Sequence, residues 1–98
     1  MEVRFGNADL ERLEIDPGYL GGWPLGIVRA FRKRLNFVRQ AASERDLYAW
    51  KSLHIERLKG DRQGQESMRL NDQWRLIFVM EGEGQEKCLI VIGIEDYH

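Results

Sequence analysis

The chain has 98 residues, the usual size of one compact domain, so we expect residues 1–98 to form a single domain. A net charge of −1 argues against a general nucleic-acid binder, and no apolar run approaches the length of a transmembrane helix. The first residues do not resemble a signal peptide, and one cysteine cannot form a disulfide within the chain. These features predict a cytoplasmic protein without membrane association.

The N-terminal part predicts a short strand, a short helix and a loop. Residues 2–5 alternate polar and apolar side chains, as in a strand. A helix is expected over residues 8–14, because Asn7 is a good helix cap. Four glycines follow in residues 18–26 without the spacing or the preceding strand of a phosphate-binding loop, so this stretch predicts a flexible loop.

A longer amphipathic helix is predicted after Pro24. Apolar residues recur there at helical spacing over four to five turns, namely at Ile27, Val28, Phe31, Leu35, Val38 and Ala42. Residues 29–45 carry six basic side chains against Glu44 alone, so the helix could present a basic face to a polyanion or simply an ordinary solvated surface. A further short turn is predicted at residues 46–50.

The C-terminal half predicts strands joined by tight turns. Strands are expected at residues 53–58, 65–70, 74–80 and 87–94. Since the helices come first and consecutive hairpins follow, the predicted class is α+β with an antiparallel sheet. The last strand is too apolar to fray, so it should hold the four residues that follow it, 95–98, on a rigid support.

Chemistry that depends on a metal or a cofactor has no support in the sequence. His54, His98 and Cys88 lack the spacing of a metal site, and no nucleophile motif is visible, so neither a metal nor a cofactor is expected. Cys88 lies in an apolar strand and is predicted to be a core thiol.

Basic residues are expected to gather near the terminal acid, phenol and imidazole. Lys59 and Arg62 flank a tight turn, and Arg69 and Arg75 lie on strands that a hairpin brings together. Cations in one groove can hold a phosphodiester and stabilise charge on it, while His98 or Lys59 moves a proton. With RNA as the substrate, its own 2′-hydroxyl can be the nucleophile.

Three motifs resemble the HigB branch of the RelE/ParE toxin superfamily: Leu58-Lys59-Gly60-Asp61-Arg62, Trp74-Arg75-Leu76 after Asn71, and Glu95-Asp96-Tyr97-His98. The resemblance implies a RelE-like twisted antiparallel sheet packed against two N-terminal α-helices. It also implies a toxin of a type II toxin–antitoxin pair, which cuts messenger RNA in the ribosomal A site without a metal. The implied partner is a HigA-type antitoxin with a helix-turn-helix.

The same resemblance implies roles for individual residues. The family's catalytic positions match Lys59, Asp96, Tyr97 and His98, and its RNA-binding groove positions match Arg62, Arg69 and Arg75. Arg75 could instead be a strut that orders the tail. Ribosomal RNA could meet the basic helix face around Arg32, Lys33 and Arg39.

One family position departs from the pattern. Some members have a histidine two residues before the leucine of the Leu58-Lys59-Gly60 motif, where this chain has Glu56. His54 lies two residues further back, on the same face of an ideal strand, and is a candidate RNA-binding residue in its place.

Two other functions stay open at this point. A ParE-like toxin would poison a protein such as DNA gyrase without catalysis, although the terminal Glu95-Asp96-Tyr97-His98 motif argues against it. A pure interaction module would only hold a partner helix in its groove.

Overall fold

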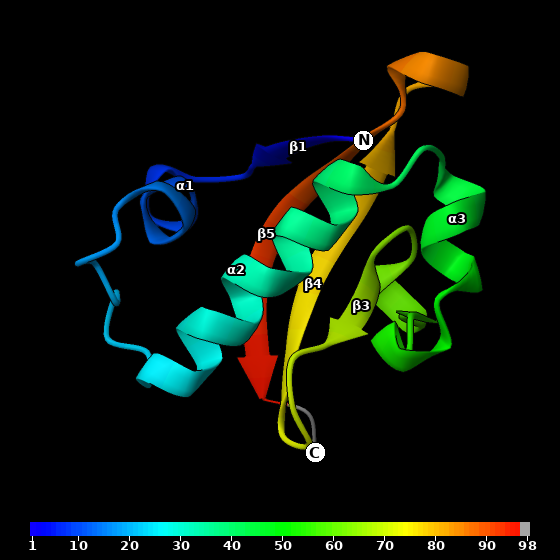
Figure 1. Cartoon of the computed structure of the whole chain (residues 1–98). Coiled ribbons are helices and arrows are strands. Elements are labelled where there is room, and N and C mark those ends of the chain that lie inside the picture. The colour runs from blue at the N-terminus through cyan, green and yellow to red at the C-terminus, as the bar shows by residue number, and fades with distance from the viewer. Residues whose placement is uncertain (97–98) are drawn as a thin grey trace.

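The computed structural model describes residues 1–96 and shows a five-stranded sheet with helices packed against one face (Figure 1). The spatial order of the strands is β1-β5-β4-β3-β2. The strands are β1 (Glu2–Phe5), β2 (Glu56–Arg57), β3 (Glu66–Arg69), β4 (Trp74–Glu81) and β5 (Cys88–Asp96). The helices are α1 (Ala8–Ile15), α2 (Leu25–Gln40) and α3 (Glu44–Ala49). The predicted α+β class is therefore confirmed.

The core lies between α2 and the sheet, as the helix periodicity predicted. The apolar face of α2 is buried from Ile27 to Val38, and it packs into one cluster with sheet residues such as Leu76, Phe78 and Leu89. Ala42, predicted to belong to this face, is exposed, and Ala41 is buried in its place. The helix ends at Gln40 and Ala41 has an extended backbone, so helical spacing no longer applies at residue 42.

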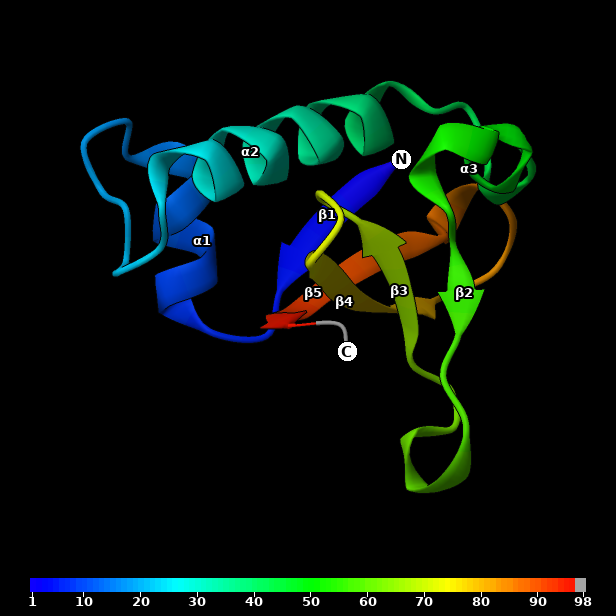
Figure 2. The same ribbon diagram turned by 90° about the horizontal axis from the view of Figure 1, so that it is seen from below.

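The parallel pairing of the strands at one edge of the sheet was not predicted. Strands β2 to β5 pair antiparallel, but β1 pairs parallel with β5 along Cys88–Val91. A short turn forces its two strands to run antiparallel, whereas β1 is separated from its neighbour by most of the chain. Figure 2 shows α2 above this sheet, with α1 beside β1 and α3 above β2.

The strand predicted at residues 53–58 is wrong over most of its length. Lys51–Leu53 form a 3-10 turn that places Leu53 in the core, and only Glu56 and Arg57 belong to β2. Between them, His54 has a left-handed backbone with φ of 48°, and its N–H donates to the Lys51 carbonyl. His54 and Glu56 are therefore not on one face of a strand, because the chain turns between them.

The last hairpins position the end of β5. Two residues after β3, the side-chain oxygen of Asn71 accepts hydrogen bonds from the N–H groups of Gln73 and Trp74, which confirms the predicted turn. Strand β5 runs two residues further than predicted, to Asp96. Its pairing with β4 skips Ile92, so a bulge sets which residues face which side from Gly93 onward.

No helix within residues 1–96 combines the length and the apolar content needed to cross a membrane.

Candidate functional site

A row of three charged residues crosses the sheet on the face away from α2. Arg69 of β3 is directly opposite Arg75 of β4, and Arg75 is directly opposite Glu95 of β5. Directly opposite residues project on the same side of a sheet. The neighbouring Met68 and Leu76 project to the helix side, where they are fully buried. The predicted proximity of Arg69 and Arg75 is confirmed.

Arg75 is buried within the protein and is not exposed on its surface. Its side chain is buried, with the whole residue only 6% exposed. Its Nε donates to Ser67 Oγ at 2.7 Å, and its Nη2 donates to the His54 carbonyl oxygen. Arg75 therefore joins β3 and β4 to the turn at His54, as expected for a strut.

A hollow of about 180 Å³, lined by both arginines and carboxylates, opens beside this row. It is lined by His54, Glu56, Arg69, Asn71, Asp72 and Arg75. Three residues predicted to bind RNA thus meet in one place, although His54 arrives there from a turn. Arg69 also pairs with Asp72, an exposed contact of the kind that is weak in water and that a phosphate can displace.

The turn that carries Lys59 is tied to the end of β5. Lys59 is exposed, and its ammonium group makes no hydrogen bond or ion pair with residues 1–96. Three residues on, Arg62 donates from Nη1 and Nη2 to the two carboxylate oxygens of Glu95, at 2.7 and 2.6 Å. These hydrogen bonds raise the pKa of the Arg62 guanidinium. Figure 2 shows this turn extending from β2 and β3. The ion pair therefore connects the turn to a strand that is distant from it in the sequence.

Glu95 was not singled out from the sequence. Its place opposite Arg75 depends on the bulge at Ile92, which shifts the register of β5 by one residue. The only sequence signal was an acid within the terminal motif. Arg62, predicted as a phosphate ligand, has this carboxylate as its partner in the structure.

The predicted catalytic tail is described only up to Asp96. Asp96 is opposite Trp74, so it projects to the other side of the sheet from Glu95, and its Oδ2 accepts from Gln73 Nε2 at 3.1 Å. Tyr97 and His98 lie outside the described residues. That they meet Lys59 in one hollow therefore stays a prediction.

The basic face of α2 divides into structural and exposed residues. Arg32 donates to the carbonyls of Leu13, Asp16 and Tyr19, and so holds the end of α1 and the following loop. Arg39 binds the Glu14 carboxylate through two hydrogen bonds, which raise the pKa of Arg39. Two of the three residues proposed to meet ribosomal RNA thus have structural partners.

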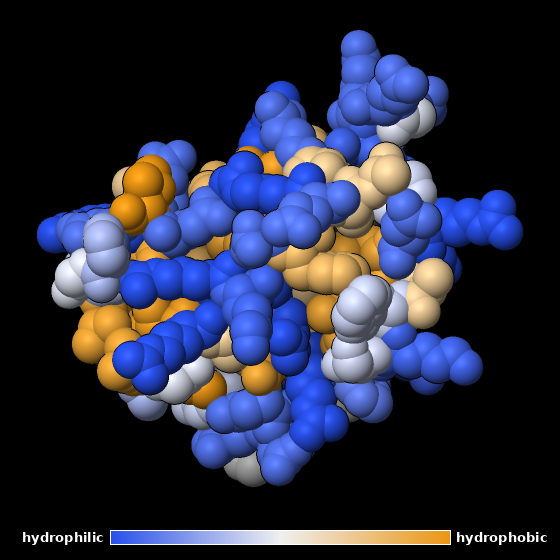
Figure 3. All heavy atoms as spheres, in the orientation of Figure 1, coloured by the Kyte–Doolittle hydropathy of each residue, from blue (hydrophilic) through white to orange (hydrophobic). Residues whose placement is uncertain are grey.

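The exposed cations lie along the other side of α2. Arg29 and Lys33 have no partner among residues 1–96, and with Arg34 they border a hollow of about 460 Å³. Burial, and then the nearby Arg69, lower the pKa of Arg34, whose Nε donates to the Arg69 carbonyl. Figure 3 shows mainly hydrophilic side chains on this face, with hydrophobic atoms visible between them.

Within residues 1–96, no group of three or more His, Cys, Asp or Glu side chains is placed to hold a metal ion. Cys88 is a buried free thiol, as predicted.

Comparisons with known proteins agree with the fold described above. A family model described as a HigB-like toxin, a RelE-like toxin of a type II toxin–antitoxin system, matches residues 4–97. The YoeB/ParE toxin from Agrobacterium tumefaciens is 20% identical, with each chain covered over 100% of its length and a TM-score of 0.59. The YoeB dimer structure from Staphylococcus aureus is 18% identical, with a TM-score of 0.55 and coverage of 100% of this chain and 97% of that chain. Among curated proteins, none matches this chain.

The predicted RelE-like fold is therefore confirmed, with three helices in residues 1–96 where two were expected.

Proposed function

The chain belongs to the HigB-like family of RelE-like toxins from type II toxin–antitoxin systems, and from this premise we propose that it is a ribosome-dependent messenger RNA endonuclease. Toxins of this family generally inhibit translation as ribonucleases. The proposed reaction is metal-independent cleavage of messenger RNA in the ribosomal A site. The proposed location is the cytoplasm, where ribosomes and messages are found.

One observation supports the proposal above the others. The Arg62–Glu95 ion pair joins the Lys59 turn to the end of β5, next to the basic row of Arg69 and Arg75. The Lys59 ammonium group, which has no partner among residues 1–96, lies on this tethered turn, and the strand end leads into a phenol and an imidazole. This combination of groups suits a phosphodiester, since it offers positive charge and proton transfer together.

The chemistry assigns one task to each group. The 2′-oxygen of the RNA attacks the adjacent phosphorus, the bond from phosphorus to the 5′-oxygen breaks, and a cyclic phosphate and a 5′-hydroxyl result. One proton leaves the 2′-hydroxyl and one reaches the departing 5′-oxygen. We assign these transfers and the charge on the phosphate to Lys59 and His98, and we assign the positioning of His98 to Asp96 and Tyr97.

The arginines have different tasks in this proposal. Arg69 offers a partly exposed cation to the RNA backbone, Arg75 supports the hollow beside the row from within, and Arg62 holds the Lys59 turn. The exposed pair Arg29 and Lys33 replaces Arg32 and Arg39 as the candidate contact with ribosomal RNA. Membership of a toxin–antitoxin family implies an antitoxin partner, and we propose one of the HigA type with a helix-turn-helix.

The test is cleavage of a message on programmed ribosomes. Lys59→Ala and a variant without His98 should each lose about a hundred-fold or more in rate, the usual cost of removing such a group. Lys51→Ala is the matched control, because Lys51 is also exposed. Both site variants should keep the circular dichroism spectrum of the unaltered protein.

Full cleavage by Lys59→Ala would remove the proposed mechanism. Intact messages together with broken DNA in arrested cells would instead support the gyrase-poisoning alternative.

A further inference from the structure

Three cations on one side of α2 make no ion pair with any of residues 1–96. Arg29, Lys33 and Arg34 border the hollow of about 460 Å³, and its other two lining residues are uncharged. Arg34 donates only to a backbone carbonyl, and its guanidinium lies close enough to that of Arg69 to feel its charge. Positive charge thus gathers here without nearby negative charge to offset it, which favours binding of a polyanion.

An aromatic pair continues this side of α2 toward its C-terminal end. Arg29, Lys33 and Phe37 are spaced four residues apart, so their side chains follow one another along the helix. The Phe37 ring contacts the ring of Trp50, the residue directly after α3, with 4.5 Å between the centroids and 57° between the planes. These four residues form a continuous surface, the α2 stripe, with cations at one end and an indole at the other.

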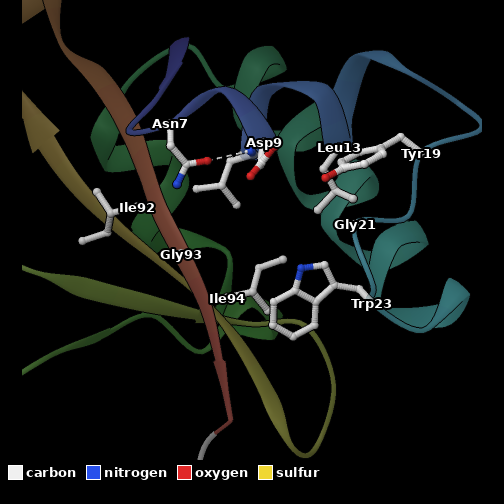
Figure 4. Close-up of a pocket in the computed structure, with 10 residues that line it drawn as sticks. Asn7, Asp9, Leu13, Tyr19, Gly21, Trp23, Ile92, Gly93 and Ile94 are labelled. Carbon is white, nitrogen blue, oxygen red and sulfur yellow. Dashed lines mark hydrogen bonds between the residues drawn. The ribbon is translucent and has the colours of Figure 1, made fainter.

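Trp50 is more exposed than the other aromatic residues. It is 52% exposed, the largest fraction for any Trp, Tyr or Phe among residues 1–96, and its indole N–H makes no hydrogen bond within them. In contrast, Trp23 and Trp74 meet edge-on at 5.2 Å between centroids, and Figure 4 shows the Trp23 ring in a hollow that Ile94 also lines. The contact with Phe37 restricts the exposed indole, which reduces the entropy lost when a partner binds.

The residue types of the α2 stripe suit single-stranded RNA. Its cations can contact neighbouring phosphates, while the face of the indole can stack on a base. In a duplex each base is covered by its neighbours, so a paired segment could use the cations but not the indole. An apolar peptide would cover the cations without offering them a negative partner, and burying unpaired charge is costly.

The α2 stripe is separated by the sheet from the row of Arg69, Arg75 and Glu95. That row projects from the face away from α2, whereas the stripe belongs to α2 and the residue after α3. A nucleotide stacked on Trp50 is therefore not the nucleotide that is cut. On a ribosome, the RNA that surrounds a bound message is ribosomal RNA, which contains unpaired nucleotides between its duplexes.

We propose that Trp50 stacks on the base of an unpaired ribosomal RNA nucleotide, while Arg29, Lys33 and Arg34 contact the phosphates beside it. This contact rests on the proposed function and deepens it, because it names what the α2 stripe recognises on the ribosome. Its task is to orient the toxin, so that the opposite face of the sheet meets the message.

The first test measures the affinity of the whole chain for ribosomes without message, by co-sedimentation at several salt concentrations. Trp50→Ala should bind about tenfold more weakly with an unchanged salt dependence, since stacking displaces no ion. Trp50→Phe keeps a flat ring and should keep most of the affinity. Lys33→Ala should also bind more weakly, and its slope of log affinity against log salt should be smaller by about one, because a phosphate contact is lost.

Ile15→Ala is the matched control. Ile15 is 66% exposed and lies on α1, outside the α2 stripe, so this variant should bind ribosomes like the unaltered toxin. Urea denaturation shows that each variant compared is folded. Unchanged ribosome binding by folded Trp50→Ala would overturn the proposal, and so would a loss for Trp50→Phe as large as that for Trp50→Ala.

A second test identifies the partner while keeping an aromatic ring at position 50. The photoreactive residue p-benzoylphenylalanine replaces Trp50, and the ribosomal component to which it crosslinks is sequenced. The expected product is a crosslink to an unpaired nucleotide of ribosomal RNA. Crosslinks confined to the message, to a duplex segment or to a ribosomal protein would overturn the proposal.

Message cleavage is measured separately, so that this proposal and the proposed function fail in different ways. Ribosome binding that depends on Trp50, without any cleavage, would count against the endonuclease and leave the ribosomal RNA contact intact. Normal cleavage together with ribosome binding that does not depend on Trp50 would overturn the contact and leave the endonuclease.

Discussion

At the scale of single residues, the arginines of the site differ in their burial and in their hydrogen-bond or ion-pair partners. Arg75 is buried and donates hydrogen bonds to Ser67 and His54, whereas Arg69 is partly exposed and pairs with the highly exposed Asp72. Removing a buried donor leaves its acceptors without partners, which costs more than losing a solvated ion pair. Residues of the same type in one row should therefore affect stability and activity differently.

We expect Arg75→Ala to lower the free energy of unfolding by about 2 kcal/mol, because the Ser67 hydroxyl and the His54 carbonyl lose their donor. Arg69→Ala should change it by less than about 0.5 kcal/mol while still weakening message cleavage. Urea denaturation beside a cleavage assay separates the two effects. An Arg75→Ala protein as stable as the unaltered one would show that Arg75 is not a strut.

At the scale of elements, the site depends on a contact between a turn and a distant strand. The 3-10 turn Gly60–Arg62 has its own backbone hydrogen bond to Gln63, but it contacts the strand end through the Arg62–Glu95 pair. Gly60 and Gly64 have φ of 72° and 91°, values that glycine adopts without strain and that allow the tight reversal. Lys59 is therefore positioned by a side-chain link.

Breaking this link should affect cleavage without affecting the fold. We expect Arg62→Ala and Glu95→Gln each to reduce message cleavage by about tenfold, since a misplaced group loses much of its effect on rate. The double variant Arg62→Glu with Glu95→Arg restores an ion pair of reversed polarity, so it should recover most of the activity. Single-turnover cleavage at low and high salt is the measurement.

If the double variant stayed as inactive as the single ones, Arg62 would be needed as a cation for RNA and not as a tether. Limited proteolysis within residues 60–64 gives an independent readout, because an untethered turn should be cut faster.

At the scale of the whole molecule, α3 is joined to the sheet by a hydroxyl–carboxylate contact. The Tyr48 hydroxyl donates to Glu66 Oε1 at 2.6 Å, and Glu66 is buried although the Tyr48 residue as a whole remains 38% exposed. Burial of the hydroxyl, followed by the hydrogen bond to the negative Glu66, raises the pKa of Tyr48 well above its usual value of 10.0. The folded state therefore retains this proton when the unfolded state has lost it.

Stability should consequently fall as the pH rises above about 10, the ordinary pKa of tyrosine. Below that pH the hydroxyl is protonated in both states, so the stabilising contribution is complete. Above it, unfolding releases a proton and becomes more favourable with each step in pH. Chemical denaturation from pH 8 upward should show a steeper decline for the unaltered protein than for Tyr48→Phe, and parallel curves would contradict the assignment.

The sequence alone predicted those features that depend on residues close to one another in the chain. Hydrophobic spacing specified the buried face of α2, and the residue types at Asn7 and Asn71 specified a helix start and a hairpin turn, because these depend on neighbours a few residues away. The combined motifs around Lys59, Trp74 and Asp96 were specific enough to indicate the toxin family. The approach of Arg69 to Arg75 followed from the hairpin.

Other features were decided only when distant segments packed together. The parallel pairing of β1 with β5 and the Arg62–Glu95 ion pair each join residues that lie far apart in the chain. The turn at His54 gives that residue a left-handed backbone instead of the extended backbone of a strand. A single skipped residue at Ile92 determines that Glu95, and not Asp96, faces the basic row. Local propensity carries no information about such a register shift, because its energy comes from the partners on both sides of the strand.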